Sequence, residues 1–96
     1  MQTNALFKKK LLLVKNELAR IDPYGLLAGG APEDEFDREA LAIARSITHE
    51  SGVQSIAEAF ASVLNNALGL NDSPALYLSA AQHLHDALQA FWTHWR

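Results

Sequence analysis

The sequence of residues 73–95, SPALYLSAAQHLHDALQAFWTHW, contains the longest helical pattern in the chain. Its apolar side chains recur at steps of three or four residues, at Tyr77, Ala81, Leu84, Leu88, Phe91 and Trp95. Such steps return to one face of an α-helix, so the stretch predicts an amphipathic helix with Leu84, Leu88 and Phe91 buried at its centre. Ser73 and Pro74 favour a helix start, because serine caps free amides and proline lacks the amide that a first turn leaves unpaired.

The N-terminal stretch has the same period. Residues 4–21 repeat it at Phe7, Leu11, Val14, Leu18 and Ile21. Asp22-Pro23 follows, and proline disfavours helical geometry in the residue before it. We therefore expect a first helix that ends at Ile21, and a loop over the glycine-containing residues 24–31.

Two helices are predicted between this loop and Ser73. The second helix begins near Pro32 and runs to about Glu50, with Gly52 beyond its end, on the period of Phe36, Ala40, Ile43, Ala44 and Ile47. The third begins at Ser55, which has the capping-box spacing to Glu58, and continues through Ile56, Phe60, Val63, Leu64 and Ala67. Gly69 ends it.

The whole chain, residues 1–96, is expected to form one all-α domain: a compact bundle of about four antiparallel helices. No stretch alternates with period two, so no sheet is predicted. The connections at 51–54 and 69–73 are short, which favours antiparallel neighbours. Because there are no cysteines, disulfides, thiolate metal sites and cysteine nucleophiles are excluded.

The sequence contains no motif of a known active site, so we expect a protein that is not an enzyme and holds no metal or cofactor. His83 and His85 lie two apart and point about 200° apart on a helix, whereas shared metal ligands need steps of three or four. The glycine-rich segment at 25–30 lacks the Gly-Lys-Ser/Thr ending of a phosphate-binding loop. A concave pocket that combines His49 or His83 with a carboxylate would be the structural sign of an enzyme.

Charge is concentrated in two places. Lys8, Lys9, Lys10 and Lys15 could form a basic patch on the first helix, but the net charge of −3 makes nucleic acid an unlikely main partner. The densest cluster is acidic and consists of Glu33, Asp34, Glu35, Asp37 and Glu39. A helix N-terminus favours nearby acids, which explains the first three. Asp37 and Glu39 lie farther along, so two interpretations stay open for the cluster: helix stabilisation and recognition of a basic partner.

The run from Ile21 to Leu27, with its Asp22-Pro23-Tyr24 turn, is followed by Ala31-Pro32-Glu33-Asp34-Glu35-Phe36. This pattern resembles a family of small bacterial proteins with an Asp-Pro turn and an Ala-Pro-x-Asp-Glu-aromatic helix start. The resemblance implies a four-helix domain in the bacterial cytosol, related to proteins whose genes in some genomes lie beside secreted toxin modules. Motif and charge pattern meet at Asp22, Tyr24, Asp34 and Glu35.

These observations give one leading functional hypothesis and two alternatives. The leading hypothesis is a cytoplasmic, non-catalytic protein-binding domain, an immunity protein that neutralises a bacterial toxin with a basic surface. Its candidate partner-binding residues are Asp22, Tyr24, Glu33, Asp34, Glu35, Asp37 and Glu39. The first alternative is a nucleic-acid-associated accessory protein that uses the basic first helix, and the second is a small enzyme whose site forms between subunits. No stretch is long and apolar enough to predict a membrane span.

The fold prediction can be checked by circular dichroism on the purified chain. The spectrum should be strongly helical, because every long apolar pattern has the helical period. A sheet content above about 10% would contradict that period analysis.

Overall fold

The computed structural model describes residues 2–22, 29–30, 36–48 and 50–95. Over these residues the elements in chain order are the helices α1 (Gln2–Ile21), α2 (Asp37–Ser46) and α3 (Val53–Leu68), the 3₁₀ turn η2 (Pro74–Tyr77) and the helix α4 (Leu78–Trp95). Within the described part of the chain there is no strand, and the all-α prediction is confirmed.

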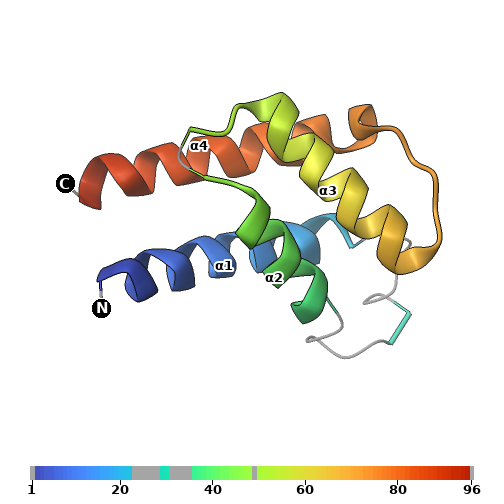
Figure 1. Cartoon of the computed structure of the whole chain (residues 1–96), viewed down its shortest axis with the longest axis horizontal. Coiled ribbons are helices and arrows are strands. Elements are labelled where there is room, and N and C mark those ends of the chain that lie inside the picture. Colours follow the sequence, from blue (N-terminus) through green and yellow to red (C-terminus); the bar gives the residue numbers. More distant parts are fainter. Residues whose placement is uncertain (1, 23–28, 31–35, 49, 96) are drawn as a thin grey trace.

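The four helices form a closed ring of neighbours. α1 packs on α2, α2 on α3, α3 on α4, and α4 on α1. α1 and α4 lie side by side and antiparallel, with both chain ends at the left of Figure 1. α2 and α3 cross this pair obliquely and also run in opposite directions (Figure 1). The predicted antiparallel bundle is therefore confirmed. Its radius of gyration is 13.0 Å.

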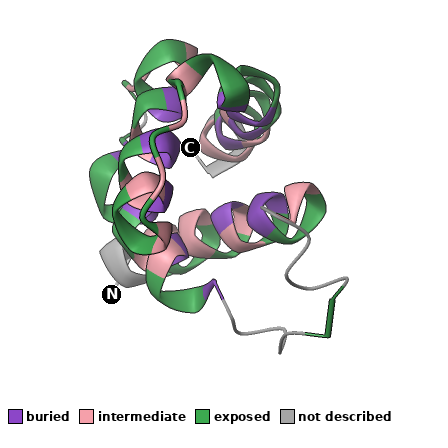
Figure 2. Cartoon of the chain, turned by 90° about the vertical axis from the view of Figure 1, so that its right-hand side faces the viewer, coloured by how far each residue is buried: buried purple, intermediate pink, exposed green. Residues whose placement is uncertain are grey.

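The core is built from the apolar faces predicted from the sequence, which point inward from each helix (Figure 2). Its largest fully buried side chains come from all four helices and the segment after α2: Val14, Leu18, Ile43, Ile47, Ile56, Phe60, Leu64, Leu84 and Leu88. Tyr77 of η2 joins them, with its ring centroid 6.1 Å from that of Phe60. One continuous core therefore connects the four helices and η2.

The prediction that Phe91 is buried is wrong. Phe91 is only half-buried, whereas Leu84 and Leu88 are each 1% exposed. The reason is that α1 and α4 extend beyond α2 and α3 at the end that holds Phe91 (Figure 1). At that end Lys9 Nζ of α1 lies 5.8 Å from the centroid of the Phe91 ring.

The end of α2 also differs from the prediction. The helix stops at Ser46 instead of near Glu50, and Ile47 has extended geometry with φ −115° and ψ 148°. Ile47 is fully buried, and its carbonyl accepts a hydrogen bond from Lys10 Nζ of α1 at 2.6 Å. This hydrogen bond links α1 to the residue that follows α2, and it holds the chain in place where it leaves that helix.

The start of α3 corrects two further predictions. The helix begins at Val53, so Gly52 is its N-terminal cap residue and does not terminate α2. The amide of Ile56 donates to the Gly52 carbonyl at 3.1 Å, which already places Ser55 inside the first turn. Ser55 is therefore not the cap, and the capping box with Glu58 does not form.

The other helix ends agree with the sequence. Gly69 ends α3 in the left-handed region at φ 66°, where glycine is favoured because it has no Cβ. Ser73 Oγ accepts from the Ala75 amide at 3.2 Å, with Pro74 at the first helical position, although the turn that they start is the 3₁₀ turn η2. α1 ends at Ile21, as predicted from Asp22-Pro23. The predicted start of the second helix at Pro32 lies outside the described residues.

Replacing Leu88 by alanine should lower the free energy of unfolding by about 2–5 kcal/mol, because it removes buried methyl groups and leaves a cavity. Urea titration followed by circular dichroism measures this change. Leu12→Ala is the matched control, because Leu12 lies within α1 but is 48% exposed, and it should cost less than about 1 kcal/mol. Equal losses for the two variants would contradict the assignment of Leu88 to the core.

Candidate functional site

The seven candidate partner-binding residues divide into two groups. Asp22, Asp37 and Glu39 lie in the described structure, whereas Tyr24, Glu33, Asp34 and Glu35 lie outside the described residues. Asp22 follows the last residue of α1 with a φ of 43°, and its amide donates to the Leu18 carbonyl at 2.8 Å. It thus forms part of the C-terminal cap of α1.

Asp37 and Glu39 both lie in the first turn of α2, because this helix begins at Asp37. The expectation that they lie too far along the helix to interact with its N-terminal amides is therefore wrong. Phe36, the cap residue, makes no side-chain bond to these amides. Asp37 and Glu39 are acids of this first turn, and their negative charge stabilises the partial positive charge of the helix start.

Asp37 also has a partner on another helix. Lys15 Nζ of α1 lies 3.1 Å from Asp37 Oδ1, and the two side chains are 42% and 50% exposed. An ion pair with this exposure contributes little to stability, since water screens both charges. The Asp37 carboxylate is half exposed and remains accessible to a second cation.

Glu39 lines an open groove between α2 and α3. The groove has a volume of about 550 Å³ and is lined by Arg38, Glu39, Ala42, Ser62, Val63, Asn66 and Ala67. Its mixed lining of one acid, one base, small apolar residues and neutral polar groups can contact a protein side chain. Of the three described candidates, only Glu39 lines this groove.

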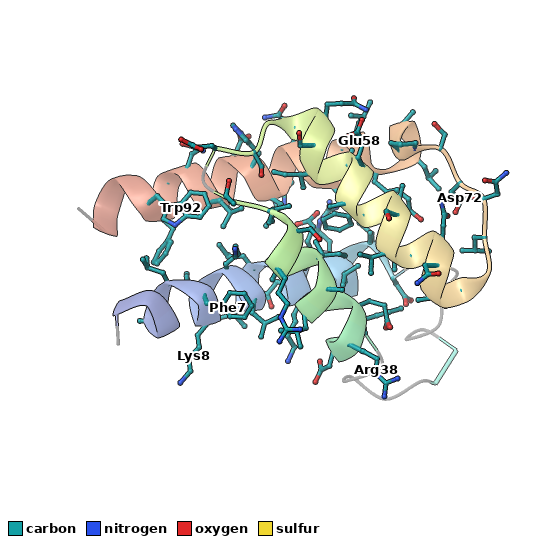
Figure 3. The ribbon with its side chains drawn as sticks, viewed as in Figure 1. Phe7, Lys8, Arg38, Glu58, Asp72 and Trp92 are labelled. Carbon is teal, nitrogen blue, oxygen red and sulfur yellow. The ribbon has the colours of Figure 1, made fainter. Side chains whose placement is uncertain are left out.

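The lysines of α1 do not form one basic surface. Lys10 Nζ donates to the Ile47 carbonyl and lies 5.3 Å from the centroid of the Phe7 ring, and burial lowers the pKa of Lys10. Lys15 pairs with Asp37, and Lys9 lies over Phe91. Lys8 points away from the helices (Figure 3). Three of the four lysines are thus directed toward three different parts of the fold.

Sequence reasoning missed Glu17, which is 4% exposed and is the only buried charged residue of the described chain. Its Oε1 accepts hydrogen bonds from Arg20, including one from Nε at 2.9 Å. Its Oε2 lies 2.7 Å from Nδ1 of His83 on α4. One signal was available in the sequence: Glu17 follows Val14 by three residues and therefore falls within the apolar face of α1.

His83 lines a second recess, of about 350 Å³, together with Arg20, Ser79, Gln82 and Asp86. The His83 side chain is 66% exposed, whereas that of His85 is 29% exposed. Gln82 Nε2 donates to Asp86 Oδ1 at 2.9 Å and holds that carboxylate along α4. The recess thus combines His83 with one carboxylate, that of Asp86, while the buried Glu17 carboxylate contacts the same imidazole.

No group of three or more potential metal ligands occurs among the described residues. Over the same residues, no helix has the length and apolar character needed to cross a membrane. In comparisons with known proteins, no family model, no curated protein and no solved structure matches the chain. Function must therefore be argued from the two surfaces described here.

Glu17→Ala should lower the free energy of unfolding by about 1–3 kcal/mol, because it removes a buried acceptor of two hydrogen bonds from Arg20 within α1 and the partner of His83 on α4. Thermal and urea unfolding would measure the loss. Glu58→Ala, which removes an exposed acid of α3, should stay within about 0.5 kcal/mol of the wild type. If the two variants were equally stable, the Glu17 contacts would not contribute to the fold.

Proposed function

We propose that this chain is a non-catalytic protein-binding domain whose acidic surface at the start of α2 binds a basic surface of a partner protein. The observation that carries the proposal is the location of its charge. Five acids and one arginine between residues 33 and 39 carry −4, so the remaining residues, with seven basic and six acidic side chains, carry +1. The net charge of −3 therefore arises from this one segment.

The described part of the segment supports binding in two ways. Asp37 and Glu39 occupy the first turn of a helix that is anchored in the core through Ala40, Ile43 and Ala44. Charges on a rigid helix keep their positions, so a partner binds them with little loss of conformational freedom. Glu39 also lines the open groove between α2 and α3, which can receive a basic side chain beside a carboxylate.

For the partner we propose a bacterial toxin, which makes the chain an immunity protein. This step rests on the resemblance of residues 21–36 to the toxin-associated family described above. An inhibitor that covers a toxin needs a rigid body and a complementary surface, and it needs no catalytic group of its own. The nucleic-acid alternative is less well supported, because Lys9, Lys10 and Lys15 are all engaged with other parts of the fold.

The test uses the product of a toxin-like coding region next to the gene as the binding probe. Glu39→Lys should slow association with this protein by about tenfold, because opposite charges accelerate the encounter of the two proteins. Stopped-flow or surface plasmon resonance at several salt concentrations measures the rate. The association rate of the wild type should fall as salt rises, and that of the variant should depend less on salt.

Glu58→Lys provides the matched control, because it makes the same charge change on an exposed residue of α3. Figure 3 shows Glu58 at the top of the molecule and Arg38, which neighbours Glu39 on α2, at the bottom. This variant should associate nearly as fast as the wild type. An equal effect of both substitutions would exclude a localised acidic interface, and a neighbourhood of housekeeping genes alone would contradict the immunity function.

A further inference from the structure

We propose that His83 is a phosphoryl-acceptor residue whose Nε2 takes a phosphoryl group from an acyl phosphate or a related activated phosphate. The inference concerns the recess between α1 and α4 and does not depend on the acidic surface of α2. It is carried by the geometry of Glu17, Arg20 and His83. Each of these residues contributes one requirement for the transfer.

The first requirement is a nitrogen with a free lone pair. Nδ1 of His83 lies 2.7 Å from Oε2 of Glu17, and an ionised carboxylate only accepts hydrogen bonds. Arg20 donates hydrogen bonds to the other carboxylate oxygen of Glu17, Oε1, as arginine does to an ionised carboxylate. Against an ionised Glu17 the hydrogen bond places a proton on Nδ1, so the tautomer it selects has its lone pair on Nε2.

The second requirement is access combined with a fixed ring. Glu17 is 5% exposed in its side chain and belongs to the face of α1 that packs in the core, so it holds the imidazole from the protein side. The His83 side chain is 66% exposed on α4, in a recess that opens to solvent. A fixed ring on a rigid helix leaves its outward nitrogen accessible even to a donor carried by another protein.

The third requirement is positive charge for the incoming group. The Arg20 guanidinium lines the same recess and is always protonated, so it can interact with the oxygens of a phosphoryl group. Asp86 also lines the recess, and its negative charge repels an incoming anion. A hydrogen bond from Gln82 to the Asp86 carboxylate reduces this repulsion without removing it. We therefore expect Asp86 to slow the transfer and Arg20 to favour it.

The chemistry is a simple displacement at phosphorus. The Nε2 lone pair attacks the phosphorus atom, and the bond from phosphorus to the acyl oxygen breaks, which releases a carboxylate. The proton on Nδ1 stays in its hydrogen bond to Glu17, whose negative charge stabilises the positive charge that develops on the ring. No electron transfer and no further reactant is required.

Two other uses of this recess fit the contacts less well. A metal site would need a third ligand, and no group of three potential ligands exists among the described residues. A serine nucleophile would need Ser79 to be hydrogen-bonded to His83, and the described structure contains no such bond. The imidazole itself is thus the nucleophile that this arrangement presents.

The experiment treats the full chain with phosphoramidate, a small phosphoryl donor. When a histidine nitrogen attacks its phosphorus atom, ammonia is the leaving group. Intact mass and peptide mapping under alkaline conditions locate the phosphoryl group. In the wild type it should appear first on His83 and more slowly on the other histidines. His83→Gln should lose this fast phase, and His85→Gln, the matched control two residues along α4, should keep it.

Glu17→Gln tests the positioning residue in a chain whose fold is verified by circular dichroism. The rate of His83 labelling should fall by about tenfold or more, the size of effect that loss of a hydrogen-bonded partner has behind metal-binding histidines. Because a glutamine amide can donate to Nδ1, the neutral tautomer should also shift toward Nε2–H, which ¹⁵N NMR of the ring nitrogens detects. Asp86→Asn should accelerate labelling and Arg20→Gln should slow it.

Two outcomes would overturn the inference: equal labelling rates on all histidines of the wild-type chain, or an unchanged rate and tautomer in a folded Glu17→Gln variant. Neither outcome concerns binding of a protein to the acidic surface of α2. Failure here is therefore distinguishable from failure of the proposed function.

Discussion

Each of the four helices has one apolar face, and none can bury that face alone. Packing the faces against one another produces the ring in which every helix contacts the next and α4 closes on α1. Phe60 and Leu64 of α3, Leu18 of α1 and Leu88 of α4 are all buried in the resulting core. The burial of apolar surface is the main favourable contribution to the stability of the fold. The polar contacts between the helices lie around this apolar core.

Helix α1 connects the other helices through polar groups as well as apolar ones. Lys10 binds the carbonyl just after α2, Lys15 pairs with the first residue of α2, and Glu17 binds His83 of α4. The contacts differ in their contribution, because Glu17 is buried whereas the Lys15–Asp37 pair is half exposed. The charged side chains of α1 therefore serve mainly to link α1 to the other helices. Fewer of them are left to contact an external ligand.

The two surfaces that remain have different chemistry. The start of α2 presents fixed negative charge beside an open groove, as a site for a basic protein requires. The recess at His83 presents an oriented imidazole beside an arginine, as a phosphoryl acceptor requires. A small bundle can hold both, because each uses only a few side chains on a helix that is already fixed by the core.

The sequence by itself determined the number and type of helices, most of the core, and the helix ends at Ile21, Gly69 and Ser73, because periodicity and capping are local properties. The C-terminal end of α2, the start of α3, the exposure of Phe91 and the location of Asp37 and Glu39 in a first turn are visible only in the tertiary structure. Glu17 and His83 are 66 residues apart, so no local pattern could reveal their hydrogen bond. Only the antiparallel packing of α1 and α4 brings a carboxylate within the apolar face of one helix against the histidine of the other.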